Sequence, residues 1–395
     1  MKLKTMSWKL QENILDQNDF GALINFIKKT KRFTQFIKVR EFETEFAKWQ
    51  GCKYCVYVNS GSSANLLLIN AWKTLKGWSS EDEIIVSSVT WSTNIASVIQ
   101  NNLTPVFVDV NLNDLSFDYE KLKDAITPKT KAIFITHLIG FSANINEIKK
   151  IIKGREIMIL EDCCESQGAQ IGNIKVGNFG AGGTFSFYWG HHMTTVEGGM
   201  ICTNDEELYK MLLLKRSHGL ARELPEKYHK ELKRTYPDID FKFLFLTDGF
   251  NVRNTELHAV IGLIQLKKLG GFIRKRNKNY RLFLDICSKY DDLILIKKEG
   301  VSSFVLPFIF KDRQKKEEFQ RFITEKGIES RPLVSGNMLR QPFLKKFGDS
   351  KAFKNADFLH TNAFYIGNNQ FVNKDRLKFL NSLMESFFGK KKTYE

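Results

Sequence analysis

Short apolar runs alternate with stretches of helical periodicity along the first half of the chain. The apolar runs are rich in β-branched residues and predict buried strands, whereas apolar positions recurring every three or four residues predict helices. The predicted strands are residues 54–58, 83–86, 105–108, 132–136, 157–160, 184–187 and 200–203, and the predicted helices are residues 64–75, 93–99, 119–125 and 145–152. This alternation indicates βαβ crossovers and therefore an α/β fold around a mainly parallel sheet.

The pattern changes after residue 255. A long helical periodicity follows, and a basic stretch, Arg274-Lys275-Arg276, comes after it. The remaining chain predicts two strands and two helices, at residues 293–296, 303–310, 315–326 and 375–388. We therefore expect an N-terminal segment and large domain over residues 1–270 and a small C-terminal α+β domain over residues 271–395.

Composition narrows the classes of protein that the chain can be. The 395 residues are 43% hydrophobic and 26% charged, which is typical of a globular protein, and the net charge is +16. Such a charge raises nucleic acid, anionic membranes and phosphorylated small molecules as partners. The basic residues are dispersed, as in Lys28-Lys29 and Lys149-Lys150, so we expect no nucleic acid partner. No apolar run reaches the length of a membrane span or forms a signal peptide, so we expect a cytoplasmic protein without a membrane partner.

Candidate chemistry follows the predicted strands, because ligands of parallel sheets bind at the carboxyl ends of the strands. Ser60-Gly61-Ser62 lies between a strand and a helix, where backbone N–H groups and hydroxyls can bind a phosphate. Ser60 can equally be a simple N-cap. Asp162 ends another strand, where a carboxylate can hold a protonated ring nitrogen or cap a helix. Trp91 follows a third strand and can stack on a planar cofactor or pack in the core.

The segment Thr184–Gly199 is the most informative part of the sequence. It resembles the lysine segment of the DegT/DnrJ/EryC1/StrS sugar aminotransferases, in which Ser-Phe, three residues, Lys and then Glu-Gly-Gly follow one another. Ser186-Phe187 and Glu197-Gly198-Gly199 match this pattern, but His191 stands at the lysine position. The resemblance implies the type I aminotransferase fold, with a mainly parallel seven-stranded sheet in the large domain and a small α+β domain. It also implies pyridoxal 5′-phosphate (PLP) as the cofactor and nucleotide-linked keto-sugars as substrates.

The histidine implies a different reaction from that of an aminotransferase. Imidazole cannot bind PLP covalently as lysine does, but it can accept and donate a proton near neutral pH. His191 thus resembles the catalytic histidine of the 3-dehydratase branch of this family. That branch removes the C3 hydroxyl of a GDP-linked 4-keto-6-deoxymannose in the biosynthesis of 3,6-dideoxysugars such as the colitose of lipopolysaccharide O-antigens. The resemblance implies that L-glutamate regenerates pyridoxamine 5′-phosphate (PMP) and that ammonia is released.

The resemblance extends over residues 35–345 and implies a role for each matching residue. Ser60, Gly61, Ser62 and Ser186 would bind the cofactor phosphate, Trp91 its ring face, Asp162 its ring nitrogen, and Glu165 its 3-oxygen where the family has Gln, while Asn251 would reach the phosphate in the neighbouring subunit of a homodimer and His218, Arg331 and Asn337 would lie beside the substrate.

Three different interpretations compete with this one. The first is a related branch with the same histidine that carries an iron–sulfur cluster, which needs several thiolates. No cysteine occurs between Leu220 and Asn251, so we expect no cluster. Cys52-Lys53-Tyr54-Cys55 lacks a second pair, and we expect no metal there. The second is an aminotransferase that uses a different lysine (Lys175, Lys210 or Lys215, all off register), and the third is a non-catalytic basic binding protein.

Overall fold

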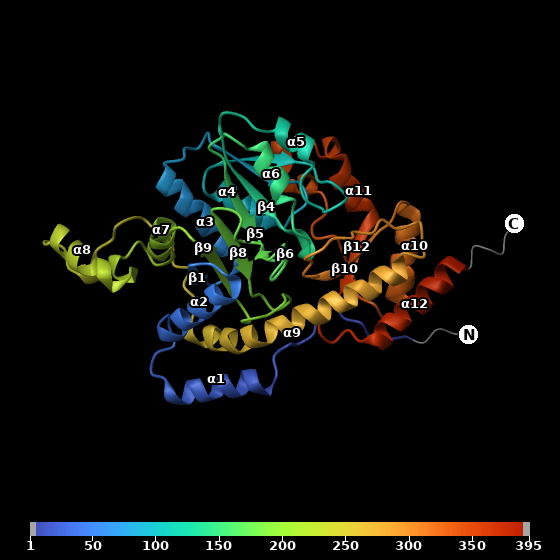
Figure 1. Ribbon diagram of the computed structural model, residues 1–395, viewed down its shortest axis with the longest axis horizontal. Coiled ribbons are helices and arrows are strands. Elements are labelled where there is room, and N and C mark those ends of the chain that lie inside the picture. Colours follow the sequence, from blue (N-terminus) through green and yellow to red (C-terminus); the bar gives the residue numbers. More distant parts are fainter. Residues whose placement is uncertain (1–4, 390–395) are drawn as a thin grey trace.

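The computed structural model describes residues 5–389, and a seven-stranded sheet forms its centre (Figure 1). The strand order is β1-β9-β8-β5-β4-β2-β3. The strands are β1 (Tyr54–Val58), β2 (Glu83–Ser87), β3 (Thr104–Val108), β4 (Thr130–Thr136), β5 (Met158–Asp162), β8 (Gly182–Ser186) and β9 (Gly199–Thr203). Only β9 runs antiparallel to its neighbours, so the sheet is mainly parallel. The predicted α/β aminotransferase-type sheet is confirmed.

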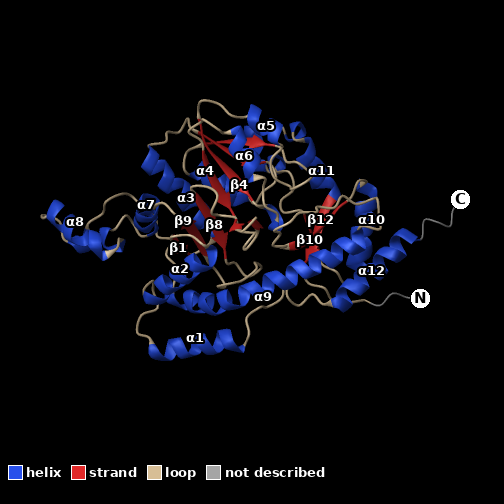
Figure 2. Cartoon of the chain, in the orientation of Figure 1, coloured by secondary structure: helices blue, strands red, loops and turns tan. Residues whose placement is uncertain are grey.

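Helices cover both faces of this sheet, as the enclosure of the strands in Figure 2 shows. Along β2, Ile84 and Val86 face one side and Ile85 the other, as the two-residue period of a strand requires. The first face packs against α3 (Gly61–Lys76), α4 (Ser92–Gln100) and α7 (Glu206–Arg216). The second face packs against α5 (Tyr119–Asp124), α6 (Ile145–Ile151), α2 (Ile37–Gln50) and α9 (Glu256–Cys287). Burial on both faces explains the nearly continuous apolar character of the strands.

A second, antiparallel sheet forms the core of the C-terminal region. Its order is β10-β12-β11, with β10 (Val305–Ile309), β11 (Ser330–Pro332) and β12 (Ala363–Gly367). It packs with α10 (Arg313–Glu325), α11 (Lys354–Asn362) and α12 (Lys374–Gly389). The strand predicted at residues 293–296 is wrong, because only Leu293 makes an isolated bridge, to Phe310. The predicted small α+β domain is otherwise present.

The division of the chain at residue 270 stays a prediction. Helix α9 runs through that residue without interruption. The N-terminal segment also packs on the small domain, where Trp8 is fully buried and its indole nitrogen donates to the Gly367 carbonyl at 3.0 Å. Helix α1 (Gln17–Lys29) lies along α9, held by Lys268, which pairs with Asp19 at 2.7 Å. Residues 1–4 and 390–395 at the outer limits of the two predicted domains lie outside the described residues.

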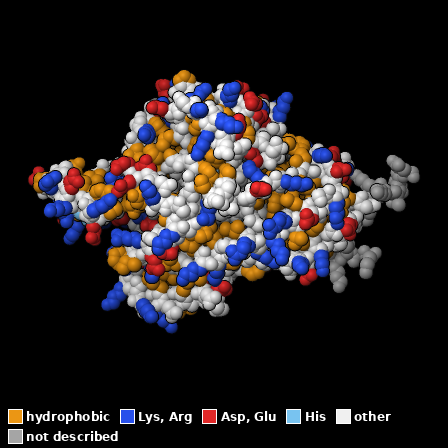
Figure 3. Space-filling model, viewed as in Figure 1, with side chains coloured by type: hydrophobic (Ala, Val, Ile, Leu, Met, Phe, Trp, Pro, Cys, Tyr) orange, Lys and Arg blue, Asp and Glu red, His pale blue; other side chains and the backbone are white. Residues whose placement is uncertain are grey.

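Smaller elements complete the fold. Strands β6 (Gln170–Ile171) and β7 (Ile174–Lys175) form a short hairpin, and the short helix α8 (His229–Thr235) lies on an arm that projects from the large domain (Figure 1). Within residues 5–389, none of the helices combines the length and the apolar character that crossing a membrane requires. Lys and Arg side chains are scattered among Asp and Glu over the face shown in Figure 3.

Candidate active site

The phosphate-binding residues predicted from the sequence meet at the carboxyl ends of β1 and β8. Ser60 follows β1 and caps α3, where its Oγ accepts a hydrogen bond from Ser63 N at 3.0 Å. Ser186 ends β8, and a Cβ added to Gly61 would lie 2.6 Å from the Ser186 Cβ. Glycine is therefore required for this close approach. The N–H groups in the first turn of a helix have no partner within the helix, so α3 presents donors and the positive end of its dipole beside the Ser186 hydroxyl. Ser62, in the same first turn, is exposed.

Asp162 is a buried carboxylate held by amide groups from two helices. Its Oδ2 accepts hydrogen bonds from Asn65 Nδ2 at 2.8 Å and Asn94 Nδ2 at 3.4 Å, and its Oδ1 accepts one from Cys164 N at 3.1 Å. Thr184 in turn fixes Asn65 through a 2.6 Å hydrogen bond. Turns rather than a helix follow Asp162, so the alternative role as a helix cap does not apply. Asn65 and Asn94 are not predicted from the sequence, although amides at buried helix positions are a signal for such a role.

The preceding residue, Glu161, belongs to the opposite side of β5 and fixes the end of that strand. Its carboxylate accepts hydrogen bonds from Gly177 N at 2.7 Å, Phe179 N at 2.7 Å and Gly180 N at 2.8 Å. His137 Nε2 adds a fourth contact at 3.0 Å. These donors offset the cost of burying the carboxylate. The Glu-Asp pair thus divides into a structural residue and a residue that faces the site.

His191 lies in the turn segment between β8 and β9. Its imidazole stacks on Phe304 from the small domain, with ring centroids 5.1 Å apart and planes 24° apart. Among residues 5–389 its Nδ1 has no hydrogen-bond partner although it is buried. Burial, and to a lesser degree the Arg276 guanidinium, lower the pKa of His191 to about 4. The ring is therefore neutral near pH 7 and can accept a proton.

The neighbouring histidine has a different environment. His192 is fully buried, and its Nε2 meets the Ser302 carbonyl oxygen at 3.0 Å and the Ser302 Oγ at 3.1 Å. Burial holds the pKa of His192 well below its ordinary value. His192 thus links the two domains, whereas His191 lines a small cavity together with Arg331, Arg276 and Tyr365. Arg276, Phe304 and Tyr365 are not predicted from the sequence, because they come from the small domain and the long helix.

Trp91 and Glu165 complete the surroundings of Asp162. Trp91 precedes α4, the helix that carries Asn94, and its side chain is 55% exposed. Glu165 Oε2 accepts a hydrogen bond from Ile139 N at 2.9 Å. Burial, with a smaller contribution from the Asp162 charge, raises the pKa of Glu165 to about 7. Glu165 is therefore a hydrogen-bond donor or acceptor at neutral pH, according to its protonation.

The remaining predicted residues fall into two groups. His218 and Asn251 are exposed and lie on adjacent segments, joined by the bridge between Ser217 and Asn251. Asn337 is fully buried, and its Nδ2 donates to Asp357 Oδ1 at 2.7 Å and to Ser350 O at 3.0 Å. These contacts hold the loop after β11. The substrate-side roles of His218, Arg331 and Asn337, and the phosphate role of Asn251, stay predictions.

The donor set fits a phosphorylated pyridine such as PLP. The glycine-lined helix end and Ser186 suit a phosphate, the buried Asp162 suits a protonated ring nitrogen, and the unpartnered Nδ1 of His191 suits a group undergoing proton transfer.

Comparison with known proteins agrees with this geometry. A profile of the DegT/DnrJ/EryC1/StrS aminotransferase family matches residues 15–379. GDP-4-keto-6-deoxy-D-mannose 3-dehydratase of Escherichia coli O55:H7 is 39% identical over 392 residues, covering 96% of this chain and 100% of the relative.

Solved structures of such a dehydratase superimpose along nearly the whole chain. A variant of GDP-4-keto-6-deoxymannose-3-dehydratase with bound GDP-perosamine gives a TM-score of 0.88 at 38% identity and covers 96% of this chain and 100% of its own. The same enzyme with a trapped PLP-glutamate geminal diamine gives a TM-score of 0.87 at 37% identity, with coverage of 95% and 100%. The predicted fold type is therefore confirmed by proteins well above the identity at which only the fold can be compared.

Proposed function

Because this chain belongs to the DegT/DnrJ/EryC1/StrS aminotransferase family, we propose that it is a PLP- and PMP-dependent 3-dehydratase of GDP-4-keto-6-deoxy-D-mannose. It removes the C3 hydroxyl, releases ammonia and uses L-glutamate to restore PMP, as a step of 3,6-dideoxysugar biosynthesis. The observation that carries the proposal is His191 at the lysine position of a site whose phosphate and ring-nitrogen contacts are otherwise in place.

The cofactor is held by several non-covalent contacts. The first turn of α3, from Gly61 to Ser63, and the Ser186 hydroxyl hold the phosphate, Trp91 covers the ring, and Asp162 holds the ring nitrogen. When bound, the protonated pyridine ring supplies an electron sink for breaking bonds on the attached substrate. Asn65 and Asn94 keep the Asp162 carboxylate in one orientation, so that its contact to the nitrogen is preorganised.

His191 moves the proton. Its neutral imidazole takes up a proton as a base and returns it to the departing hydroxyl oxygen as an acid. The stacking on Phe304 fixes the ring plane, and the Arg276 guanidinium holds the backbone carbonyl of His191 at 3.3 Å. Because His191 has no amine, it leaves the cofactor free to dissociate, which distinguishes this site from that of an aminotransferase.

An aminotransferase that uses a different lysine has no support from the lysines considered. Lys175 donates to the Trp49 carbonyl at 2.5 Å, and Lys210 pairs with Glu207 at 2.6 Å. Lys215 is buried against Asp248. Each is occupied elsewhere and none lines the cavity beside His191.

A homodimer and a cytoplasmic location are further parts of the proposal. The arm that carries α8 exposes several large apolar side chains, namely Tyr236, Ile239, Phe243 and Phe245, of which Phe243 is 64% exposed. Such a patch is typical of a protein interface. Asn251 follows this arm, which suits a residue that serves a neighbouring subunit. Nucleotide-linked sugars are formed from nucleoside triphosphates inside the cell, which supports the cytoplasm.

The proposal is tested by incubating the purified protein with PLP, L-glutamate and, in turn, GDP-, CDP- and dTDP-linked 4-keto-6-deoxy sugars. We expect ammonia and a 3-deoxy-4-keto sugar from the GDP-linked substrate. A product that retains the amino nitrogen would identify an aminotransferase instead. Turnover with only the CDP- or dTDP-linked sugar would retain the dehydratase reaction and overturn the proposed nucleotide.

His191→Lys is the matched variant for this experiment. Lysine should bind PLP covalently and produce the absorbance of a protonated imine, while dehydration is lost. Dehydration that persists in this variant would remove His191 from the mechanism.

A further inference from the structure

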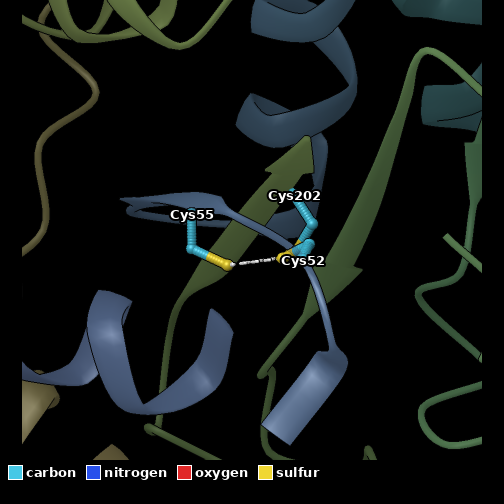
Figure 4. A group of neighbouring side chains, drawn as sticks. All are labelled: Cys52, Cys55 and Cys202. Carbon is cyan, nitrogen blue, oxygen red and sulfur yellow. Dashed lines mark hydrogen bonds between the residues drawn. The ribbon is translucent and has the colours of Figure 1, made fainter. Parts of the chain in front are cut away.

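Three cysteine sulfurs converge at the end of the β1–β9 pair that lies away from the candidate active site. Cys55 on β1 and Cys202 on β9 face each other directly in the antiparallel register, and their sulfurs are 3.2 Å apart. Cys52 lies in the turn between α2 and β1, and its sulfur is 3.6 Å from that of Cys55. Figure 4 shows the three side chains turned toward one another. All three sulfurs lie within 4.8 Å of one another.

We propose that Cys52, Cys55 and Cys202 form a three-thiolate site for a soft d¹⁰ metal ion, Zn²⁺ or Cu⁺. Thiolates are the protein ligands that these ions prefer. With metal–sulfur bonds of about 2.3 Å, tetrahedral coordination places the sulfurs about 3.8 Å apart. The sulfur separations of 3.2 and 3.6 Å approach this value, so small rotations of the side chains would admit an ion.

The three thiols differ in a way that favours binding of a cation. Hydrogen bonds from Cys202 and Cys55 lower the pKa of Cys52 to about 4, so that this sulfur carries negative charge. Burial raises the pKa of Cys55 and of Cys202 well above the ordinary value. A metal ion would replace the two remaining thiol protons and attract all three sulfurs.

An entry path and a compensating charge are both present. Cys52 is half-buried and lines, with Cys55, a cavity of about 680 Å³. Arg40, Lys48 and Lys53 line the same cavity, and their charge suits a complex in which three thiolates outnumber the charge of the ion. Glu43 also lies there, but Arg216 at 2.5 Å and Tyr57 N at 2.7 Å already engage its carboxylate. Three sulfurs therefore form the ligand set, and water from the cavity can complete tetrahedral Zn²⁺.

The experiment is a metal titration of the reduced, full-length protein under anaerobic conditions with a phosphine as reductant. Zn²⁺, Cd²⁺ as its spectroscopic substitute, and Cu⁺ are added in separate series. We expect one ion per chain and, for Cd²⁺ and Cu⁺, a thiolate-to-metal charge-transfer band. Stronger retention of Zn²⁺ would indicate a fourth, solvent ligand, and stronger retention of Cu⁺ a three-coordinate site.

Cys52→Ser is the decisive variant and Cys287→Ala its control, because Cys287 is buried in the small domain away from the cluster. We expect Cys52→Ser to weaken binding at least tenfold and Cys287→Ala to leave it unchanged. Equal binding by Cys52→Ser and the unsubstituted protein, or no binding at micromolar metal, would overturn the proposal.

A measurement without substitution covers the case in which a variant does not fold. Bound metal should slow alkylation of Cys52 at least tenfold, as followed by mass spectrometry of its peptide. An unchanged alkylation rate at saturating metal would also overturn the site. Neither result depends on dehydratase activity, so the failure of this proposal is distinguishable from the failure of the proposed function.

Discussion

The two ends of the β1–β9 strand pair use the same register for different chemistry. At one end Val58 pairs with Gly199, and a Cβ on Gly199 would lie 2.2 Å from the Ser60 carbonyl oxygen. The missing side chain lets the loop before α3 approach closely and present backbone donors. At the other end, three residues along, Cys55 pairs with Cys202 and two sulfurs take the space. One end therefore positions the backbone for an anion, and the other positions side chains for a cation.

The comparison teaches that the two ends answer to different constraints. The end near Ser60 depends on turns and on the end of a helix, so small residues are required there. The thiol end depends on side chains packed between α2 and the sheet, where burial changes their acidity. Substitutions at the catalytic end should therefore change turnover, and substitutions at the thiol end should change metal binding.

The largest effect on turnover is expected for His191→Asn. The substitution removes the group that transfers the proton while retaining a polar side chain of similar size. General acid–base catalysis contributes about 10² to 10⁴ in rate, so we expect a loss of turnover of about 10³. The measurement is ammonia release under saturating L-glutamate, with PLP binding followed by absorbance. Turnover within tenfold of the unsubstituted protein would contradict the role of His191.

His192→Asn is the matched control for that prediction. His192 is buried and contacts Ser302, so its loss should lower the melting temperature. His191→Asn should leave the melting temperature nearly unchanged, because the Nδ1 of His191 has no partner within residues 5–389. The two adjacent histidines therefore separate turnover from stability.

Asp162→Asn is expected to reduce turnover by about 100-fold. An amide at this position no longer favours a protonated ring nitrogen, and a weaker electron sink slows bond breaking. It also faces two amide donors from Asn65 and Asn94, so part of its hydrogen bonding is lost. Steady-state kinetics and a titration with PLP measure the two consequences. Full turnover with unchanged PLP affinity would contradict the contact to the nitrogen.

Glu165 predicts a pH dependence of stability in the cofactor-free protein. Its folded-state pKa of about 7 lies above the ordinary value of 4.5. The raised value means that its contribution to stability is fully present below pH 4.5 and is lost as the pH rises through 7. Relative to Glu165→Gln, the protein should thus lose about 2 kcal/mol between pH 5 and pH 8.

Urea unfolding of both proteins at these two pH values tests this loss. Parallel changes in the unfolding free energies of the two proteins would show that Glu165 is ionised in the folded state at both pH values.

Much of the sheet could be predicted from the sequence because its strands are buried on both faces. Strand β1 has the predicted bounds, 54–58, since Gly51 and Ser60 punctuate a continuous apolar run. The strand expected at residues 293–296 does not form, because pairing depends on a neighbouring strand and only Leu293 meets Phe310. Local pattern thus determines strands with helices on both sides and fails where partners come from distant segments.

The candidate site divides in the same way. Ser60, Asp162, Ser186 and His191 follow strands or lie in one motif, so the sequence indicates them. Asn65, Phe304 and Tyr365 act through tertiary contacts that no local pattern records. The Cys52-x-x-Cys55 pair illustrates the limit, because its third sulfur lies 147 residues beyond Cys55 along the chain and becomes a neighbour only through the β1–β9 register.

The smallest effect on turnover is expected for Cys52→Ser in metal-free protein. Cys52 is half-buried in a turn, and serine retains a donor that can reach the Tyr54 carbonyl, which the thiol contacts at 3.5 Å. We expect turnover to stay within twofold and the unfolding free energy to fall by less than about 1 kcal/mol. Kinetics and urea unfolding provide the measurements. A tenfold loss of turnover would couple the two ends of the strand pair and contradict their independence.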